Sequence, residues 1–197
     1  LVFIAGESVR AASWGLSGYA RQTTPQLAQL PVTNFADMRS CGTDTAVSLP
    51  CMFSHLGRDG YDSRKADYEN LLDLLQRAGL AVLWIDNQSG CKSLCARVPH
   101  VDIPVNADPA LCSGGECLDE ILLRGLDARI DALPAERRAR GIVVVLHQMG
   151  SHGPAYAKRS PQAIKRFAPE CTSAALQECS RESVVNAYDN TILYTDH

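Results

Sequence analysis

Three short stretches of the 197-residue chain are apolar from end to end, and they constrain the fold more than any other feature. They are Leu1–Ala5, Leu80–Ile85 and Ile142–Leu146. A strand that is apolar on both faces belongs in a sheet covered on both sides, which is the usual setting of parallel strands. Helix-like segments separate the three stretches. The sequence therefore predicts an α/β fold with a mostly parallel sheet sandwiched by helices.

Helical periodicity and capping signals predict the helices that cover this sheet. Each segment shows at least one of three signals: an apolar face, an N-terminal cap, or a glycine or proline near its end. They are expected over residues 24–30, 45–53, 64–78, 118–133 and 181–197. Pro50 lies inside the second segment and should kink or shorten it, because proline lacks the N–H that an inner helical turn needs.

The eight cysteines fall in four couples of near neighbours: Cys41 with Cys51, Cys91 with Cys95, Cys112 with Cys117, and Cys171 with Cys179. Loop closure favours pairing between near neighbours, so we expect four local disulfides. Such a set indicates an oxidising compartment: a periplasm, an endoplasmic reticulum lumen or the cell exterior. The alternative is a zinc site built from the two middle couples, although neither has the C-x-x-C spacing of common zinc motifs.

Composition excludes several classes of protein. Hydrophobic residues make up 46% of the chain and charged residues 21%, which is enough apolar material for a core and speaks against intrinsic disorder. The net charge of −3 makes nucleic acid a poor candidate partner. The apolar runs are too short to cross a bilayer. The chain opens on an apolar strand with no basic leader, so we expect a piece of a longer protein, cut at both ends.

Chemically reactive side chains follow each apolar stretch. They are Glu7 after the first, Asp86, Asn87, Ser89 and Lys92 after the second, and His147 and His152 after the third. Ligands of open α/β sheets bind beyond the carboxyl ends of the strands, so this pattern predicts a metal and anion site at one edge. The plainer alternatives are a solvated Glu7 and a core His147. A core role suits His152 less, because it lies in a glycine-rich loop.

A hydroxyl-rich segment between Cys41 and Cys51 leads into the predicted helix over residues 45–53. A hydroxyl at a helix N-terminus lies where free N–H groups and the helix dipole favour negative charge. This setting suits an alkoxide nucleophile or a phosphoryl group. The alternative is that Thr43 or Thr45 is simply the N-cap.

The motifs resemble, in order, those of the lipid A phosphoethanolamine transferases, the family that includes the mobile colistin-resistance enzymes. The resemblance rests on GESVR at 6–10, LSGYAR at 16–21, SCGTDTAVSLPCMFS at 40–54, WIDN at 84–87, LHQMGSHGPAY at 146–156 and NAYDN at 186–190. It implies an alkaline-phosphatase/sulfatase-like catalytic domain. Residues 1–197 would be part of that domain, without the family's N-terminal membrane domain and without its C-terminal part.

The resemblance also implies roles for single residues. Thr45 matches the family's nucleophile, which also touches a zinc ion, and Glu7 matches its metal-binding glutamate. His152 matches a histidine that contacts phosphoethanolamine, and Lys92 matches a lysine near it. Gln88 takes the place of a substrate-contacting asparagine. With His147, these last three residues are the expected substrate-binding set.

The family's two other zinc ligands form an Asp-His pair inside Ser-Asp-His-Gly-Glu. The chain ends in Asp196 and His197, but residues 188–197 resemble the family's helix just before the next strand. We therefore expect the true pair beyond the end of this chain, and do not assign Asp196 and His197 as ligands.

The implied activity is zinc-dependent transfer of phosphoethanolamine from phosphatidylethanolamine to lipid A through a phosphothreonine, a lipopolysaccharide modification that confers polymyxin resistance. The implied location is the periplasmic face of the bacterial inner membrane. Two alternatives stay open: a phosphatase-type hydrolase of the same superfamily, and a non-catalytic, disulfide-stapled periplasmic module. Sulfate ester hydrolysis is disfavoured, because Thr45 lacks the Cys/Ser-x-Pro/Ala-x-Arg context that formylglycine formation requires.

Overall fold

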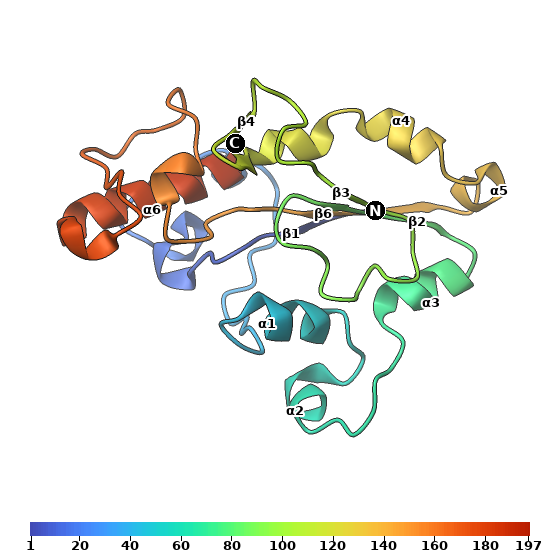
Figure 1. The fold of residues 1–197 in the computed structure, drawn as a ribbon. Coiled ribbons are helices and arrows are strands. Elements are labelled where there is room, and N and C mark those ends of the chain that lie inside the picture. Colours follow the sequence, from blue (N-terminus) through green and yellow to red (C-terminus); the bar gives the residue numbers. More distant parts are fainter. The chain divides into compact units, whose positions relative to one another are not determined.

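A parallel sheet of four strands, in the order β1-β6-β2-β3, organises one of the two units of the chain (Figure 1). The computed structural model describes residues 1–197, and this unit comprises Leu1–Ala5 and Arg39–Gln148. Every strand pairing in the sheet is parallel, which confirms the predicted sheet. The strands are β1 (Val2–Ala5), β2 (Ala81–Asp86), β3 (His100–Asp102) and β6 (Ile142–His147).

The register aligns the carboxyl ends of three strands. Ala5 pairs with His147, and His147 pairs with Asp86 on its other side. β2 is buried along its whole length, as its apolar sequence requires. β1 differs from the expectation of a strand buried on both faces: it lies at the edge of the sheet, and Val2 and Ile4 are 57% and 58% exposed.

Helices cover both faces of the sheet. Figure 1 shows α1 (Thr45–Met52), α2 (Gly57–Asp62) and α3 (Leu71–Arg77) on one side, and α4 (Leu126–Asp131) and α5 (Ala135–Arg138) on the other. The predicted sandwich is therefore confirmed.

Successive residues of β2 point into two separate cores, because side chains alternate along a strand. Trp84 packs on the first side and Ile85 on the second, and neither is exposed. The first core includes Leu49, Phe53, Leu72, Val82, Leu94 and Val145. The second includes Leu83, Ile121, Leu122, Leu133, Val144 and Leu146.

The predicted helix over residues 64–78 is wrong in its first half, since α3 begins at Leu71. Asn70 is the N-cap: its side chain accepts hydrogen bonds from the N–H groups of Leu72 and Asp73, and the Asp73 carboxylate accepts the N–H of Asn70. This capping box fixes the start of the helix. It leaves residues 64–70 outside the helix.

The predicted helix over residues 118–133 is broken in two. A 3₁₀ helix, η4 (Asp119–Leu123), is followed by α4, and Gly125 between them has φ of +66°. A left-handed residue interrupts the helical hydrogen bonds, and glycine adopts that conformation without steric penalty. In α1, by contrast, the helix continues through Pro50 to Met52.

The second unit comprises Gly6–Met38 and Met149–His197, and its one long helix is α6 (Arg181–Asp196). The predicted last helix is therefore confirmed. Ser180 caps it by accepting the N–H of Ser183. The other helical segments of this unit are single 3₁₀ turns, so the helix expected over residues 24–30 is only a short turn. These turns are η1 (Ala11–Ser13), η2 (Gly15–Ser17), η3 (Leu27–Gln29), η5 (Tyr156–Lys158) and η6 (Leu176–Glu178).

The structure pairs the cysteines as predicted, and no cysteine is free. The disulfides are Cys41–Cys51, Cys91–Cys95, Cys112–Cys117 and Cys171–Cys179. The third joins the two strands of a small hairpin, β4 (Cys112–Ser113) and β5 (Glu116–Cys117). A zinc site made of cysteines is excluded, because every candidate thiol is in a disulfide. None of the helices combines the length and the apolarity needed to span a membrane.

Candidate functional site

Thr45 is the first residue of α1, directly after the N-cap Asp44. The Asp44 side chain accepts the N–H of Ala46 at 2.7 Å, and its carbonyl accepts those of Val47 and Ser48. The cap is therefore Asp44, and the alternative in which Thr43 or Thr45 serves only as the cap is wrong. The disulfide between Cys41 and Cys51 ties the segment before Thr45 to the last turn of the helix.

Lys92 lies on a strained turn that the Cys91–Cys95 disulfide closes. Lys92 and Ser93 have φ angles of +49° and +71°, which residues other than glycine seldom adopt. Strain of this kind persists where the surrounding structure enforces it, commonly at ligand sites. The Lys92 ammonium donates to the carbonyl and the hydroxyl oxygen of Ser89, both at 2.7 Å. Ser89 in turn donates to the side-chain carbonyl of Gln88.

Asp86 and His147 meet at the carboxyl ends of their strands, as the sequence predicted. His147 Nδ1 lies 2.7 Å from Asp86 Oδ2, which also accepts the Trp84 indole N–H at 2.9 Å. Asp86 Oδ1 accepts the N–H groups of Gln88 and Gly90. His147 is 1% exposed, so it is a core residue. It positions the Asp86 carboxylate through a hydrogen bond. Asp86 in turn positions the 88–90 turn.

The Asp86 carboxyl is ionised under ordinary conditions. Burial raises its pKa, but the hydrogen bonds from His147 and Trp84 together lower it more, so the pKa of Asp86 lies below its usual value. An ionised Asp86 only accepts hydrogen bonds, so His147 Nδ1 carries the proton that lies between them.

A cavity of about 330 Å³ lies among α1, residues 61–70 and the 92–97 turn. It brings the helix that begins with Thr45 together with Lys92, two parts of the predicted site. Its lining includes Ala46, Pro50, Ser54, Tyr61, Arg64, Asp67, Tyr68, Glu69, Asn70, Lys92, Ser93, Leu94 and Arg97. Residues 61 to 69 are not expected at a site from the sequence, because the periodicity predicts a helix over residues 64–78 that covers the core.

In the second unit, Glu7 lies in a loop that contacts residues 150 and 151. The Glu7 carbonyl accepts the N–H of Ser151 at 3.0 Å, and the Glu7 carboxylate accepts the hydroxyl of Ser8 at 2.7 Å. Gly150 has φ of +51°, and a Cβ there would lie 3.0 Å from both N and O of Glu7. Only glycine allows this close approach of the two backbones.

Helix α6 holds the same loop from its other side. The Tyr188 hydroxyl donates to the carbonyl of Ser8 at 2.7 Å and accepts the N–H of Arg10 at 2.8 Å. The Tyr188 ring packs edge-on against Tyr156, with centroids 5.3 Å apart. Burial raises the pKa of Tyr188, so its hydroxyl stays protonated and keeps donating.

The loop that carries His152 is anchored to α6 as well. The Thr191 hydroxyl, on α6, donates to Ser151 Oγ at 2.6 Å, and both residues are buried. The His152 carbonyl accepts a hydrogen bond from Nε of Arg159 at 3.0 Å. Within the second unit, the structure therefore brings together the segments that carry Glu7 and His152.

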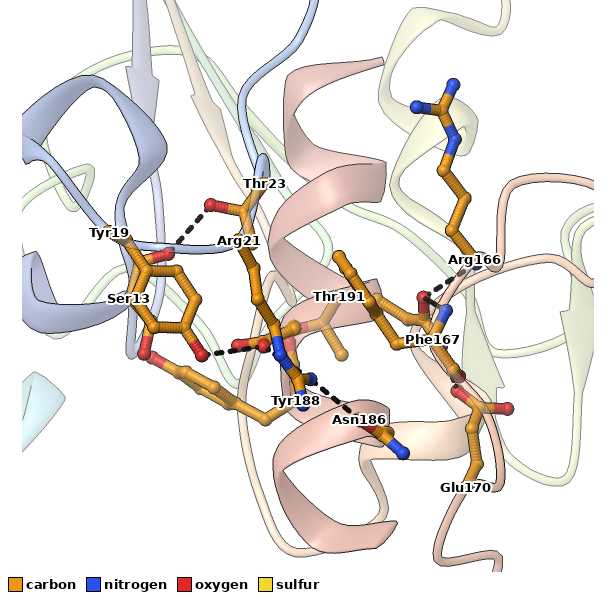
Figure 2. Close-up of polar contacts among 12 residues, drawn as sticks. Ser13, Tyr19, Arg21, Thr23, Arg166, Phe167, Glu170, Asn186, Tyr188 and Thr191 are labelled. Atoms are coloured by element: carbon orange, nitrogen blue, oxygen red, sulfur yellow. Dashed lines mark hydrogen bonds and ion pairs between the residues drawn. The ribbon is translucent and has the colours of Figure 1, made fainter. Parts of the chain in front are cut away.

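Figure 2 shows the polar network that supports this helix. Tyr19 and Arg21 both donate to Asp189 Oδ2, at 2.8 and 3.0 Å, and Arg21 also donates to Asn186 Oδ1 at 2.7 Å. Asp189 is fully buried, and its Oδ1 has no hydrogen-bond partner. Burial raises the pKa of Asp189 more than Tyr19 and Arg21 lower it.

A second part of the network fixes residues 166–170 (Figure 2). Asn190 Oδ1 accepts the N–H groups of Arg166 and Phe167, and its Nδ2 donates to the Phe167 carbonyl and to Glu170. The NAYDN motif singled out in the sequence therefore serves, through Asn186, Asp189 and Asn190, to attach loops to α6.

The family described as Sulfatase matches residues 1–197. The chain belongs to the sulfatase family. This membership agrees with the mostly parallel sheet between helices, so the predicted alkaline-phosphatase/sulfatase-like fold is confirmed.

Relatives of this sulfatase-family chain are named as phosphoethanolamine or phosphatidylethanolamine transferases, in agreement with the resemblance of its motifs. It is 47% identical over 197 residues to the phosphoethanolamine transferase EptA of Salmonella typhimurium, covering all of the chain and 35% of that relative. It is 43% identical over 204 residues to the phosphatidylethanolamine transferase Mcr-1 of Escherichia coli, of which it covers 37%. The chain thus spans about a third of the length of these relatives.

Solved structures agree with these relatives. The soluble domain of lipooligosaccharide phosphoethanolamine transferase A from Neisseria meningitidis superposes with a TM-score of 0.91 at 47% identity, over 99% of this chain and 58% of that one. The C-terminal periplasmic domain of EptC from Campylobacter jejuni gives 0.83 at 39% identity, over 99% and 59%. The predicted resemblance to phosphoethanolamine transferases is confirmed.

The sulfatase-family chain does not contain a complete zinc site. No group of three or more His, Cys, Asp or Glu side chains comes together in it. The two carboxylate oxygens of Asp196 accept the N–H groups of Gln26 and Leu27, and His197 Nδ1 lies 2.9 Å from Gln26 Nε2. Structural zinc needs four ligands and catalytic zinc three. The residues present therefore do not fit a closed metal site.

The two buried aspartates should give the stability of this sulfatase-family chain opposite pH dependences. The folded pKa of Asp86 lies below the ordinary value of 3.8, so its contribution is present above that value and is lost as the pH falls through the folded pKa. The folded pKa of Asp189 lies above 3.8, so its contribution is full below that value and is lost as the pH rises through the folded pKa.

Urea unfolding at several pH values checks this expectation. Relative to wild type, Asp86→Asn should become less destabilising as the pH falls below the ordinary aspartate pKa, and Asp189→Asn less destabilising as the pH rises above it. The same sign of slope for both variants would contradict the prediction.

Proposed function

We propose that the chain is the catalytic part of an enzyme that transfers phosphoethanolamine from phosphatidylethanolamine to lipid A, by way of a phosphothreonine at Thr45. The observation that carries the proposal is the position of Thr45 at the start of α1, with capping left to Asp44, on the helix that shares a cavity with Lys92. The names of the relatives, phosphoethanolamine transferase and phosphatidylethanolamine transferase, support the identity of the transferred group.

Thr45 suits nucleophilic attack on a phosphoryl group. The positive dipole end of the first helical turn favours negative charge that develops there. In the first step, Thr45 Oγ1 bonds to phosphorus while the bond to the diacylglycerol oxygen breaks, and that oxygen leaves with a proton. In the second step, a phosphate oxygen of lipid A displaces the threonine oxygen, which regains a proton.

Lys92 supplies positive charge for both steps. Phosphoryl transfer depends mainly on positioning and on neutralising charge at the equatorial oxygens. The Lys92 ammonium is hydrogen-bonded to Ser89 and pairs with no carboxylate, so its charge is available to a phosphate. In the proposal, His152 and Gln88 contact phosphoethanolamine, and His147 acts indirectly by holding Asp86 and the 88–90 turn.

Zinc belongs to the proposal through the family resemblance. Glu7 and Thr45 are the ligands that this chain would contribute, and a bound zinc ion would lower the pKa of a coordinated oxygen acid. Two oxygen ligands do not make a tetrahedral site, so we derive no step of the reaction through the metal.

We propose that the full-length protein acts at the periplasmic face of the bacterial inner membrane, to which an N-terminal membrane domain attaches it. A relative from Neisseria meningitidis is described as an integral membrane protein, and the relative from Campylobacter jejuni as a C-terminal periplasmic domain. The disulfides suit an oxidising compartment.

A single-turnover assay on the full-length protein tests the transferase proposal. Phosphatidylethanolamine labelled in its headgroup should label the protein, and lipid A should then remove the label much faster than water does. Release of free phosphoethanolamine at the same rate with and without lipid A would instead identify a phosphatase. A protein that acquires no label would contradict both enzymes and favour the non-catalytic module.

A further inference from the structure

The cavity beside α1 has a wall that the proposed chemistry does not use. Tyr61, Arg64, Tyr68 and Arg97 belong to this part of the lining, and the lining as a whole also includes Lys92. We call the cavity the Tyr68 groove. Its volume of about 330 Å³ is in the range of sites for small organic ligands.

The wall presents an aromatic ring beside planar polar groups. Tyr68 is 54% exposed, and its ring packs edge-on against His55 at a centroid distance of 5.4 Å. The Arg64 guanidinium lies over the Tyr61 ring at 3.8 Å. Arg97 forms a two-pronged ion pair with Asp73, whose side chain is 4% exposed, so the plane of its guanidinium is fixed.

This lining suits a sugar better than a lipid. A sugar ring offers a C–H face that packs on an aromatic ring and a rim of hydroxyls that pair with planar polar groups. Tyr68 supplies the ring, and Arg64, Arg97, Asp67 and Asn70 supply the polar groups. Apolar lining is confined to Ala46, Pro50 and Leu94, which is too little to hold the acyl chains of a phospholipid.

Charge adds a preference for phosphate on that sugar. Of the cationic side chains in the groove, Arg97 is paired with Asp73, and Arg64 Nε lies 3.9 Å from the Asp67 carboxylate. Lys92 is hydrogen-bonded to Ser89 and pairs with no carboxylate, so it is the cation available to a phosphate. Lys92 stands on the strained turn, where the backbone at Lys92 and Ser93 has positive φ.

We propose that the Tyr68 groove binds the phosphorylated sugar of the acceptor. The lining of the groove includes Ala46, the residue after Thr45, with Pro50 of α1 and Ser54 beyond the end of that helix. A sugar that lies on Tyr68 would present its phosphate toward Lys92 and the first turn of α1. The inference rests on the proposed function for the identity of the acceptor, and it assigns to Tyr68, Arg64 and Arg97 the selection of a phosphorylated sugar.

Steady-state and single-turnover assays on the full-length protein test this site. Tyr68→Ala should raise the KM for lipid A about tenfold, because the sugar loses its packing surface. The rate at which phosphatidylethanolamine labels Thr45 should not change, since Tyr68 is assigned to the acceptor alone. Tyr68→Phe keeps the ring and should restore the KM. Arg64→Gln should raise the KM as well, whereas Arg58→Gln, an exposed arginine of α2 that does not line the groove, should not.

Direct binding separates failure of this inference from failure of the proposed function. Glucosamine 1-phosphate should bind the protein, and Tyr68→Ala should weaken its binding about tenfold. Equal competition by inorganic phosphate would overturn the sugar specificity. If wild-type protein transfers normally and Tyr68→Ala keeps its KM, the groove is not the acceptor site. If wild-type protein is never labelled by the donor, the transferase proposal fails. The binding of glucosamine 1-phosphate to wild type and to Tyr68→Ala then decides the sugar site.

Discussion

Replacing Thr45 by alanine should abolish phosphoethanolamine transfer in the full-length protein, with a loss of at least about a thousandfold in turnover. The substitution removes the hydroxyl that the proposal assigns to attack on phosphorus. Thr45 is only partly buried, so the substitution should change the free energy of unfolding by less than about 1 kcal/mol. Single-turnover labelling and the thermal midpoint of unfolding measure the two effects.

Neighbouring hydroxyls provide the matched controls. Thr43→Ala should leave transfer close to wild type, because Thr43 is exposed and Asp44 caps the helix. Thr45→Ser should retain part of the activity, since the hydroxyl survives without the β-branch that restricts its rotamer. Mass spectrometry of the labelled protein should place phosphoethanolamine on Thr45. Label on Thr43 or Ser48 would show that the nucleophile is misassigned.

Replacing Asp86 by alanine should be among the most destabilising single changes, at about 3–5 kcal/mol. Asp86 accepts hydrogen bonds from Trp84 and His147 and from the N–H groups of Gln88 and Gly90. Trp84 and His147 are 0% and 1% exposed, so their donors would lose a partner where water does not reach them. Burying unpaired polar groups is what makes such losses large.

An exposed aspartate is the control for this prediction. Asp131 pairs with Arg138 on the surface, and its side chain is 72% exposed, so Asp131→Ala should change the unfolding free energy by less than about 1 kcal/mol. Urea unfolding with the disulfides intact measures both variants. A loss below 1 kcal/mol for Asp86→Ala would show that Asp86 is not the centre of this hydrogen-bond network.

The parts of the fold that depend on short apolar runs could be predicted from the sequence. β2 and β6 lie where their uninterrupted apolar residues indicated, because such runs are stable only inside a covered sheet. β1 has the same apolar composition but lies at the edge. Which strand becomes the edge is decided by pairing across the sheet, and the composition of β1 carries no information on it.

The two longer incorrect helices share a physical cause: a local signal overrode the apolar periodicity. Asn70 and Asp73 form a capping box that starts α3 at Leu71, so Tyr68 lies outside the helix. Gly125 takes a left-handed conformation and separates η4 from α4. The N-x-x-D pattern and the inner glycine were the signals that could have corrected the two predictions.

The candidate site, like the fold, could be predicted from the sequence only in part. Motif resemblance and the position of strand ends pointed to Thr45, Lys92 and the Asp86–His147 pair. The burial of His147 was left open, because the sequence does not show how deep a strand end lies. Tyr61, Arg64, Tyr68 and Arg97 could not be assigned from the sequence, because they come from separate segments that meet only in the folded chain.

The disulfides have a consequence for how the protein is made. Each of the four joins cysteines that are 4 to 10 residues apart in the sequence. In the unfolded chain, both partners of a disulfide are already near each other, and the entropy lost on closing so short a loop is small. The bonds can therefore form in any order, before the sheet assembles, with little need for an isomerase to correct them.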